Sequence, residues 1–186
     1  LAGIIDGEGS ISMNVRKKKW NDWNGIGVDM KIQVVNTDDG IIEKVVNILK
    51  KIDINAFIFE RTQVPLNHKD GKTYSSEKTI LSVCVNRMVD ILNVLKLIEP
   101  HLGGQKKSRA KLIMEFIEHR QKNKCPNNHN QHKKSNGYSW MNGYEWGLVK
   151  KFYEITGGKL LPEVQRMLND HTPDTLNKCD DMICSA

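Results

Sequence analysis

The sequence has little that would mark an exported or membrane-bound protein. Its four cysteines, at positions 84, 125, 179 and 184, include no Cys-x-x-Cys pair. It has no run of about 18 apolar residues and no signal peptide. We therefore expect no membrane partner and a reducing, intracellular environment, in which Cys84 is a small buried apolar side chain.

The net charge favours a polyanionic partner. Lys and Arg number 28 against 22 Asp and Glu, which gives +6 at pH 7 and a pI near 9.1. Residues 163–186 hold five acidic and two basic residues, which leaves 26 basic and 17 acidic residues in the first 162. The larger part of the chain is therefore more basic than the total suggests, although charge alone does not identify the partner.

The length of 186 residues fits one folded domain with a small appendage. We expect residues 1–122 to form the domain and residues 123–137, which are polar, to form a linker. A helical appendage is expected at residues 138–170. The last segment, residues 171–186, is expected to be a disordered tail.

Apolar and polar residues alternate in two segments near the N-terminus, which predicts two half-buried strands. The first covers residues 11–16 and the second residues 26–34. A helix capped by Asp38 is then expected to continue to about residue 52, because its apolar residues recur at helical spacing.

The order strand, strand, helix is then repeated. Residues 56–64 and 73–85 predict a hairpin, because an Asp-Gly turn lies between them. Asn86 is expected to cap a helix that Pro100 stops near residue 98.

Further helices are expected after the loop formed by residues 103–107. They cover residues 108–121, 144–155 and 162–168. Taken together, the first 122 residues predict an α+β fold of the form helix-ββα-ββα-α, with one four-stranded antiparallel sheet and a small C-terminal helical appendage.

The chain opens with Leu-Ala-Gly-Ile-Ile-Asp-Gly-Glu-Gly-Ser at residues 1–10. This decapeptide resembles the LAGLIDADG signature almost position by position, with Glu8 where the family usually has Asp but also admits Glu. Residues 1–122 therefore resemble a LAGLIDADG homing endonuclease of the single-motif type. The resemblance implies a metal-dependent DNA endonuclease whose sheet forms a DNA-binding saddle. Because the first helix would begin near its middle, we expect it to be truncated before Leu1.

The resemblance also implies catalytic roles at the end of the first helix. Glu8 would bind Mg2+ through its carboxylate, and the backbone carbonyl of Gly7 would lie close to the metal, since hard cations take oxygen ligands. Gly7 and Gly9 would permit the sharp turn from helix to strand. Such metal sites activate water and stabilise the leaving oxygen at a scissile phosphate.

Family members place two further side chains near the metals, and both have candidates here. A polar residue just after the second strand is represented by Asn36. A lysine just before the last helix of the domain is represented by Lys106, with Lys107 beside it because the preceding loop is one residue longer than usual. These lysines would balance phosphate charge, and the polar residue would position water.

The resemblance to single-motif members of the family implies a homodimer. Residues 100–186 contain no second small-residue helix that ends in Gly-acid-Gly. A twofold dimer would bind a long pseudo-palindromic DNA site. Ala2 and Gly3 are small enough to let two copies of the helix approach closely at the dimer seam. Asp6 is expected to have a structural role at the same seam.

The outward face of the sheet would lie in the major groove of double-stranded DNA. Between residues 56 and 64 the facing is ambiguous, and we choose the side that carries Arg61 and Gln63. The basic run of residues 16–19 would contact phosphates and add salt-dependent affinity. The DNA-binding candidates are Ser12, Asn14, Arg16, Lys17, Lys18, Lys19, Asp29, Lys31, Gln33, Arg61, Gln63, Lys78 and Ser82.

Other interpretations stay open at this stage. An intron maturase of the same fold would bind RNA, and a non-cleaving relative would bind DNA without cutting it. The intact Glu8 argues against a relative that has lost its metal, but maturases can keep this acid, so the sequence alone does not exclude them. The chain also fits a remnant of a two-motif or intein-embedded protein. Cys125, His129 and His132 have a spacing compatible with zinc, although a polar loop is the simpler interpretation. The expected location is the cytoplasm or nucleoid of a bacterium or phage host, or an organelle matrix.

Overall fold

The computed structural model describes residues 1–20, 23–61, 66–67, 73–74, 79–122, 141, 143–159, 162 and 165–166, with the backbone alone for residues 17–20, 23–26, 66–67 and 73–74. The helices in this part of the chain are α1 (Ala2–Glu8), α2 (Asp39–Lys51), α3 (Met88–Ile98), the short 3-10 helix η1 (Glu99–His101), α4 (Gly104–Lys122) and α5 (Gly143–Thr156). None of these described helices is long and apolar enough to span a lipid bilayer.

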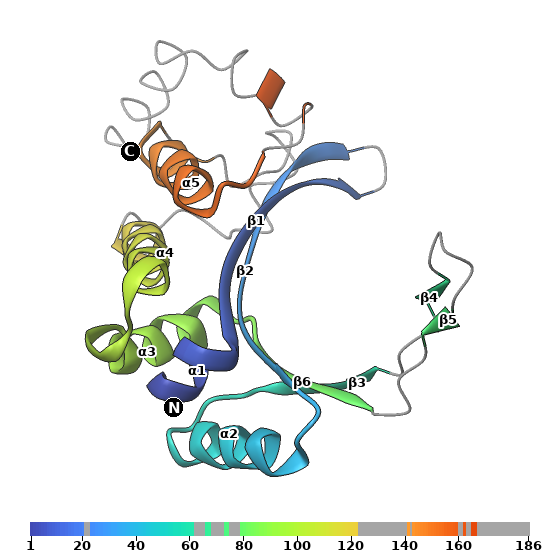
Figure 1. Ribbon diagram of the computed structural model, residues 1–186. Coiled ribbons are helices and arrows are strands. Elements are labelled where there is room, and N and C mark those ends of the chain that lie inside the picture. Colours follow the sequence, from blue (N-terminus) through green and yellow to red (C-terminus); the bar gives the residue numbers. More distant parts are fainter. Residues whose placement is uncertain are drawn as a thin grey trace. The chain divides into compact units, whose positions relative to one another are not determined.

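The strands form one large and one small sheet (Figure 1). They are β1 (Gly9–Trp20), β2 (Trp23–Asn36), β3 (Phe57–Arg61), β4 (Leu66–Asn67), β5 (Thr73–Tyr74) and β6 (Ile80–Val85). The large sheet has the order β1-β2-β6-β3, and both β2 and β3 run antiparallel to β6. The predicted α+β class with a four-stranded antiparallel sheet is therefore confirmed.

Several predicted boundaries are wrong in detail. β1 and β2 extend beyond the predicted strands, because the hairpin pairs close to its tip. In the second hairpin the structure describes β3 and β6, with a separate short pair, β4 and β5, between them in the chain, and residues 62–64 and 75–78 of the predicted strands lie outside the described residues. The predicted helix at residues 162–168 falls mostly outside the described residues.

The helix starts show where local sequence signals succeed and fail. Asp38 caps α2 as predicted, since its Oδ1 accepts hydrogen bonds from the backbone N–H of Gly40 at 2.8 Å and of Ile41 at 3.3 Å. The prediction that Asn86 caps α3 is wrong: the capping position is Arg87, whose carbonyl accepts the first helical bond from Ile91. No side chain caps this helix.

The start of α4 was also predicted wrongly. The helix begins at Gly104 and not at residue 108, because Gly104 adopts a φ of +46° that turns the chain abruptly into the helix. The backbone N–H of Lys107 already donates to the carbonyl of Gly103 at 3.2 Å. Lys106 and Lys107 therefore lie in the first turn of α4, where a loop was expected.

The chain divides into two compact units. The first comprises Leu1–Ser12 and Met30–Lys107, and the second comprises Met13–Asp29 and Ser108–Ala186. Neither unit coincides with the segments predicted from composition, whose boundaries stay a prediction. Each unit is described by itself below.

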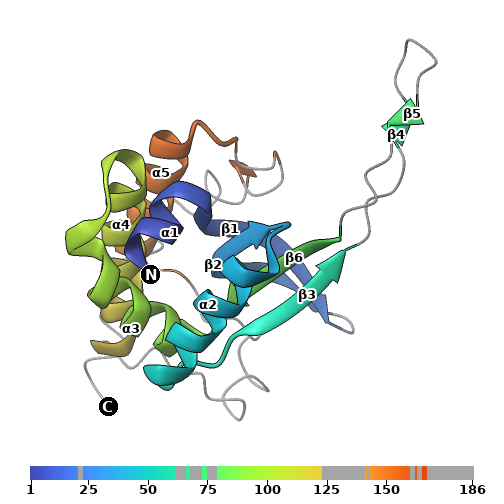
Figure 2. The same cartoon turned by 60° about the horizontal axis from the view of Figure 1, so that its bottom comes forward.

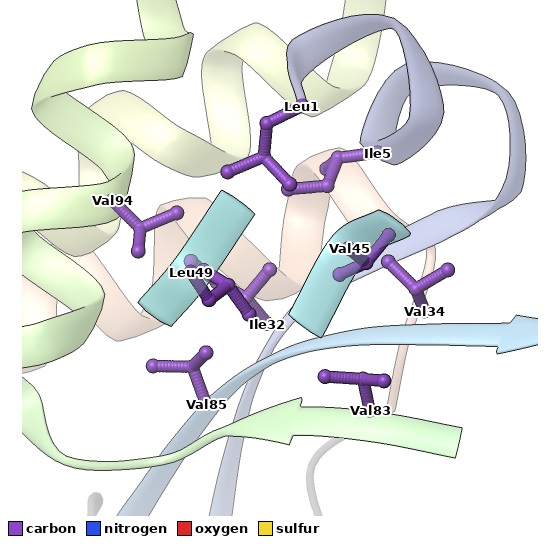
Figure 3. Close-up of a pocket in the computed structure, with 9 residues that line it drawn as sticks. All are labelled: Leu1, Ile5, Ile32, Val34, Val45, Leu49, Val83, Val85 and Val94. Carbon is purple, nitrogen blue, oxygen red and sulfur yellow. The ribbon is translucent and has the colours of Figure 1, made fainter. Parts of the chain in front are cut away.

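The core of the first unit lies between one face of its sheet strands and the helices α1, α2 and α3. A small apolar cavity in this core is lined by side chains from all of these elements, and Figure 3 shows how they converge. The lining residues are Leu1, Ile5, Ile32, Val34, Val45, Leu49, Val83, Val85 and Val94. The apolar positions of β2 and β6 therefore face the helices, as their alternation predicted.

The second unit is held together by α4, α5 and parts of β1 and β2. Phe116, Trp146 and Phe152 are buried in it. Glu145 is fully buried and is bound by Arg120, whose Nε and Nη2 donate to the two carboxylate oxygens at 3.0 and 3.1 Å. Such a paired charge is far less costly to bury than an isolated one.

The passage from α1 to β1 needs no connecting residue. Gly9 ends the helix in an extended conformation, with φ −88° and ψ 164°, and its N–H donates to the carbonyl of Ile5. A Cβ on Gly9 would lie 2.7 Å from Ile5 Cα and 2.8 Å from its carbonyl oxygen. Position 9 therefore requires glycine, because the backbone of Ile5 lies too close for a side chain. Gly7 lies inside α1 with nothing within 4 Å of a Cβ, so the prediction that it permits the turn is wrong.

Gly9→Ala is expected to lower the free energy of unfolding by about 1–3 kcal/mol, because the added methyl must displace backbone atoms. Denaturant unfolding followed by circular dichroism measures this change. Gly147→Ala is the matched control, since Gly147 lies in α5 with open space around its Cα; there we expect stabilisation of about 0.5–1 kcal/mol. Equal stability of the two variants would show that the junction tolerates a side chain.

Candidate active site and nucleic-acid interface

The C-terminal end of α1 displays an acid on the solvent side of the helix. Ile5 is only 2% exposed and fixes one side of α1 in the core. Asp6, Gly7 and Glu8 are exposed. The geometry therefore presents the Glu8 carboxylate and the last carbonyls of the helix together, where the negative end of the helix dipole also attracts cations.

A cation from α4 occupies this end of the helix. The ammonium of Lys106 donates to the carbonyl of Ile5 at 3.0 Å and also to the carbonyl of Asp6. The carbonyls in the last turn of a helix lack partners inside it, so Lys106 satisfies one that would otherwise be left over. Of the two lysines predicted near the active site, Lys106 is the one that the fold brings to α1.

The neighbouring candidates make other contacts. Lys107 lies 4.0 Å from the carboxylate of Glu99. Asp6 accepts a hydrogen bond from the backbone N–H of Gly103 at 3.3 Å, so it braces the loop before α4 in its own chain. Its predicted place at a dimer seam stays a prediction.

Asn36 ends β2, as predicted for a polar residue at this position. Its Oδ1 accepts a hydrogen bond from the backbone N–H of Asp38 at 2.9 Å. This local turn leads into the capped start of α2. The fold therefore gives Asn36 a structural task, and a role in positioning water stays a prediction.

The strand register decides which residues share the outer face, which we define as the face of the first unit's sheet strands opposite the core. Gln33, Cys84 and Phe57 lie directly across from one another, as do Val35, Ser82 and Phe59. Directly opposed residues point to the same side of a sheet. Arg61, two residues after Phe59, shares this face, which resolves the ambiguity in β3 in favour of the side we chose.

Ser82 and Cys84 on β6, which lies between β2 and β3, belong to the outer face but are little exposed. Ser82 is 8% exposed and accepts a hydrogen bond from Gln33 Nε2 at 2.5 Å. Ser82 is thus bound within the chain and little exposed, and its predicted contact with DNA stays a prediction. Cys84 is buried as predicted, and burial raises the pKa of its thiol, an effect that the positive charge of Lys31 partly opposes.

In the second unit, two predicted DNA contacts bind each other. The guanidinium of Arg16 on β1 forms an ion pair with the carboxylate of Asp29 on β2. Both side chains are accessible, with 61% and 37% of their surface exposed. Asn14 is exposed on the same strand as Arg16.

The other DNA-binding candidates are only partly described. Ser12 is half-buried, and among the described side chains its hydroxyl has no hydrogen-bond partner. Several candidates lie outside the described residues: the side chains of Lys17, Lys18 and Lys19, all of Gln63 and Lys78, and residues 125–132, whose spacing is compatible with zinc. Among those that are described, no three His, Cys, Asp or Glu residues are grouped as a metal site.

Comparison with known proteins decides the fold. No protein-family model matches the sequence, and no curated protein matches it either. Solved structures do match. The archaeal intron-encoded homing endonuclease I-Vdi141I, complexed with DNA, is 18% identical with a TM-score of 0.54, over 96% of this chain and 93% of that one.

A second match extends over the full length of the chain. The homing endonuclease I-CvuI, in complex with its target and Ca, is 17% identical with a TM-score of 0.50, over 100% of this chain and 92% of that one. The LAGLIDADG homing endonuclease I-GzeII, in complex with its DNA target, is 15% identical with a TM-score of 0.50, over 91% of this chain and 47% of that one.

The chain has the LAGLIDADG homing-endonuclease fold. At identities below one fifth the likeness establishes the fold alone, so the roles of the residues rest on the geometry above. In this LAGLIDADG fold the motif helix is α1, and Glu8 is its terminal acid.

The sequence did not single out two aromatic residues that the LAGLIDADG fold places prominently. Phe57 and Phe59 are 47% and 54% exposed on the outer face. The signal was present in the alternation of residues 57–61, but only the register with β6 shows to which face they point.

Asp29→Asn is expected to strengthen binding to any DNA duplex about threefold to tenfold at low salt, because the change removes a negative charge and releases Arg16. Fluorescence anisotropy at several salt concentrations measures it, and the slope of log K against log salt should steepen by about 1. Asp53→Asn is the control, since it changes the charge equally at the end of α2, where a φ of 56° suits Asn. Weaker binding by Asp29→Asn alone would instead mean that the ion pair orients Arg16 for DNA.

Proposed function

We propose that the protein is a site-specific homing endonuclease that hydrolyses both strands of a long pseudo-palindromic DNA site as a homodimer with Mg2+. The observation that carries this proposal is the exposed Glu8 at the junction of α1 and β1, in a chain with the fold of endonucleases that were solved with DNA. Glu8 is one acid, whereas a cut in both strands needs two reaction centres. A second copy of the chain would supply the second.

The residues at the end of α1 fit a divalent metal by their chemistry. The Glu8 carboxylate and the Gly7 carbonyl are hard oxygen donors at the negative end of a helix dipole. The same end of the helix already attracts the ammonium of Lys106, which supports its affinity for cations. When bound, Mg2+ would polarise the phosphate and lower the pKa of a bound water.

The chain's own residues would prepare the phosphate for attack. Lys106, fixed to the carbonyls of Ile5 and Asp6, would hold a positive charge at the end of the helix that carries Glu8. A charge that is already in place stabilises developing negative charge without reorganisation. Lys107, whose partner Glu99 is 4.0 Å away, can turn toward a phosphate at little cost. Asn36 would orient a water molecule through its amide.

The exposed side of α1 supports a helix-to-helix dimer seam. Among the described residues, nothing lies within 4 Å of a Cβ placed on Gly3 or Gly7, which leaves room on this side of the helix. Ala2, Gly3 and Gly7 carry almost no side chain, which allows two helix backbones to approach closely. Such a seam would bring both copies of Glu8 near one axis.

The outer face would read the DNA. Lys31, Gln33 and Arg61 belong to this face. Their donors suit guanine, adenine and phosphate oxygens in the major groove, which is wide enough for β-strands. In the second unit Asn14 and Arg16 would add further contacts, and the basic residues 17–19 would add charge.

Glu8→Gln is expected to abolish cleavage, by about a hundredfold or more, because it removes a charged metal ligand. DNA affinity should stay within about threefold of the wild type, since the acid does not read bases. Cleavage of a selected duplex with Mg2+, followed on denaturing gels, measures the first effect. Glu43→Gln, an exposed change of the same kind in α2, is the control.

Cleavage at the wild-type rate by Glu8→Gln would remove Glu8 from the site. Light scattering of the free protein tests the dimer, and a monomer both free and on DNA would contradict it. Tight binding to intron RNA with no cleavage of any duplex would favour the maturase, and duplex binding without cleavage would favour a non-cleaving DNA-binding protein.

A further inference from the structure

The outer face carries a group of apolar side chains that are exposed in the part of the chain that the structure describes. Val35, Phe57 and Phe59 are 41%, 47% and 54% exposed. We refer to these three residues as the apolar patch. Large apolar side chains grouped on one surface mark a contact site more often than scattered ones do. Ile58 is also exposed, but it points to the opposite face and does not belong to the patch.

The patch has a defined geometry. Val35 on β2 and Phe59 on β3 are in one row with Ser82 between them, and Phe57 is in the next row with Gln33 and Cys84. The rings of Phe57 and Phe59 are stacked, with centroids 6.5 Å apart. Figure 2 shows β3 at the edge of the sheet beside β6. The two small residues on β6 are covered, so the patch consists of larger side chains on both sides of the middle strand.

We propose that the apolar patch contacts the 5-methyl groups of thymine in the major groove, so that the target contains A·T base pairs under these strands. This inference rests on the proposed function, because it requires that the outer face binds duplex DNA. It adds the identity of the bases that the face selects.

The dimensions of the patch fit the groove. Neighbouring strands are about 4.8 Å apart, so β2 and β3 are separated by about 10 Å, within a major groove about 12 Å wide. Residues two apart on a strand are separated by about 6.7 Å, which is close to two base-pair steps of about 3.4 Å. The 6.5 Å between the two rings matches this spacing. Phe57 and Phe59 would therefore reach thymines two base pairs apart.

The chemistry around the patch fits the methyl group of thymine. The thymine methyl is the apolar group that duplex DNA offers in its major groove. Gln33 lies in the same row as Phe57 and suits adenine, the partner of thymine. Lys31 and Arg61 share the face beyond the two ends of the patch, whereas Glu60 points to the other face. A surface with flanking cations and no acid in these rows complements the phosphates on both sides of a groove.

Two other occupants are less favoured. Unpaired RNA bases stack on aromatic rings, but Val35, one of the three residues of the patch, offers no ring for a base to stack on. A second copy could pair with the edge strand β3, but strand pairing uses the backbone edge and not the side chains of the outer face.

The test uses the full chain and changes the DNA. A binding site is first selected from a randomised duplex library, and each thymine in it is then replaced singly by deoxyuridine, which lacks only the 5-methyl group. We expect Kd to rise about fourfold at two or more positions, at least two of them two base pairs apart, since a buried methyl is worth about 0.8 kcal/mol. With Phe59→Ala, the Kd values for thymine and uracil at one of these positions should become equal. Leu97→Ala, an equally exposed apolar residue on α3, should leave every ratio unchanged.

Each other outcome overturns the inference. Equal Kd values for thymine and uracil at all positions, in a duplex that is bound and cut, would refute the thymine contact and leave the endonuclease proposal standing. Failure to select any duplex would refute both. If Phe59→Ala weakens binding of single-stranded RNA, or changes the oligomeric mass, without changing any thymine-to-uracil ratio, the patch stacks bases or contacts a second copy instead.

Discussion

The close approach of Gly9 to Ile5 is the constraint on which the candidate site depends. A Cβ at Gly9 would lie 2.7 Å from Ile5 Cα, so the chain can pass from α1 into β1 without a loop only because position 9 has no side chain. Ile5 is held in the core by the helices and the inner face of the sheet (Figure 3). Glu8 is thereby forced outward at the end of the helix, beside the first residue of a strand.

The contacts around this junction all hold the end of α1 in place. Lys106 binds the carbonyls of Ile5 and Asp6, and the Asp6 carboxylate binds the backbone of Gly103. The loop before α4 is thus tied to the motif helix from two directions. The backbone that carries Glu8 is therefore fixed by packing and hydrogen bonds, which is the support that a metal site needs.

The sequence predicted those features that depend on local patterns. The alternation in β2 and the cap at Asp38 follow from neighbouring residues, and both were confirmed. The start of α4 was missed because a glycine pair is typical of a loop, whereas the positive φ of Gly104 starts the helix. The facing of β3 could not be predicted, since it depends on pairing with β6, about 20 residues further along the chain.

The candidate site, too, has one part that follows from local sequence and one part that depends on tertiary packing. The motif identified Glu8, because its spacing from Ile5 and Gly9 is local. The contacts of the other candidates are set by tertiary packing: Lys106 with α1, Gln33 with Ser82, and Arg16 with Asp29. Such pairs join residues that are far apart in sequence, or on different strands, and no spacing rule predicts them.

The central claim is that each chain supplies one Glu8, and with it one of the two reaction centres of the dimer. Its most direct test is a mixed dimer, purified with two different tags, of one wild-type chain and one Glu8→Gln chain. On a supercoiled plasmid with the selected site and Mg2+, this dimer should cut one strand and yield the nicked circle. A linear product formed at the wild-type rate would contradict the claim, because one Glu8 would then suffice for both strands.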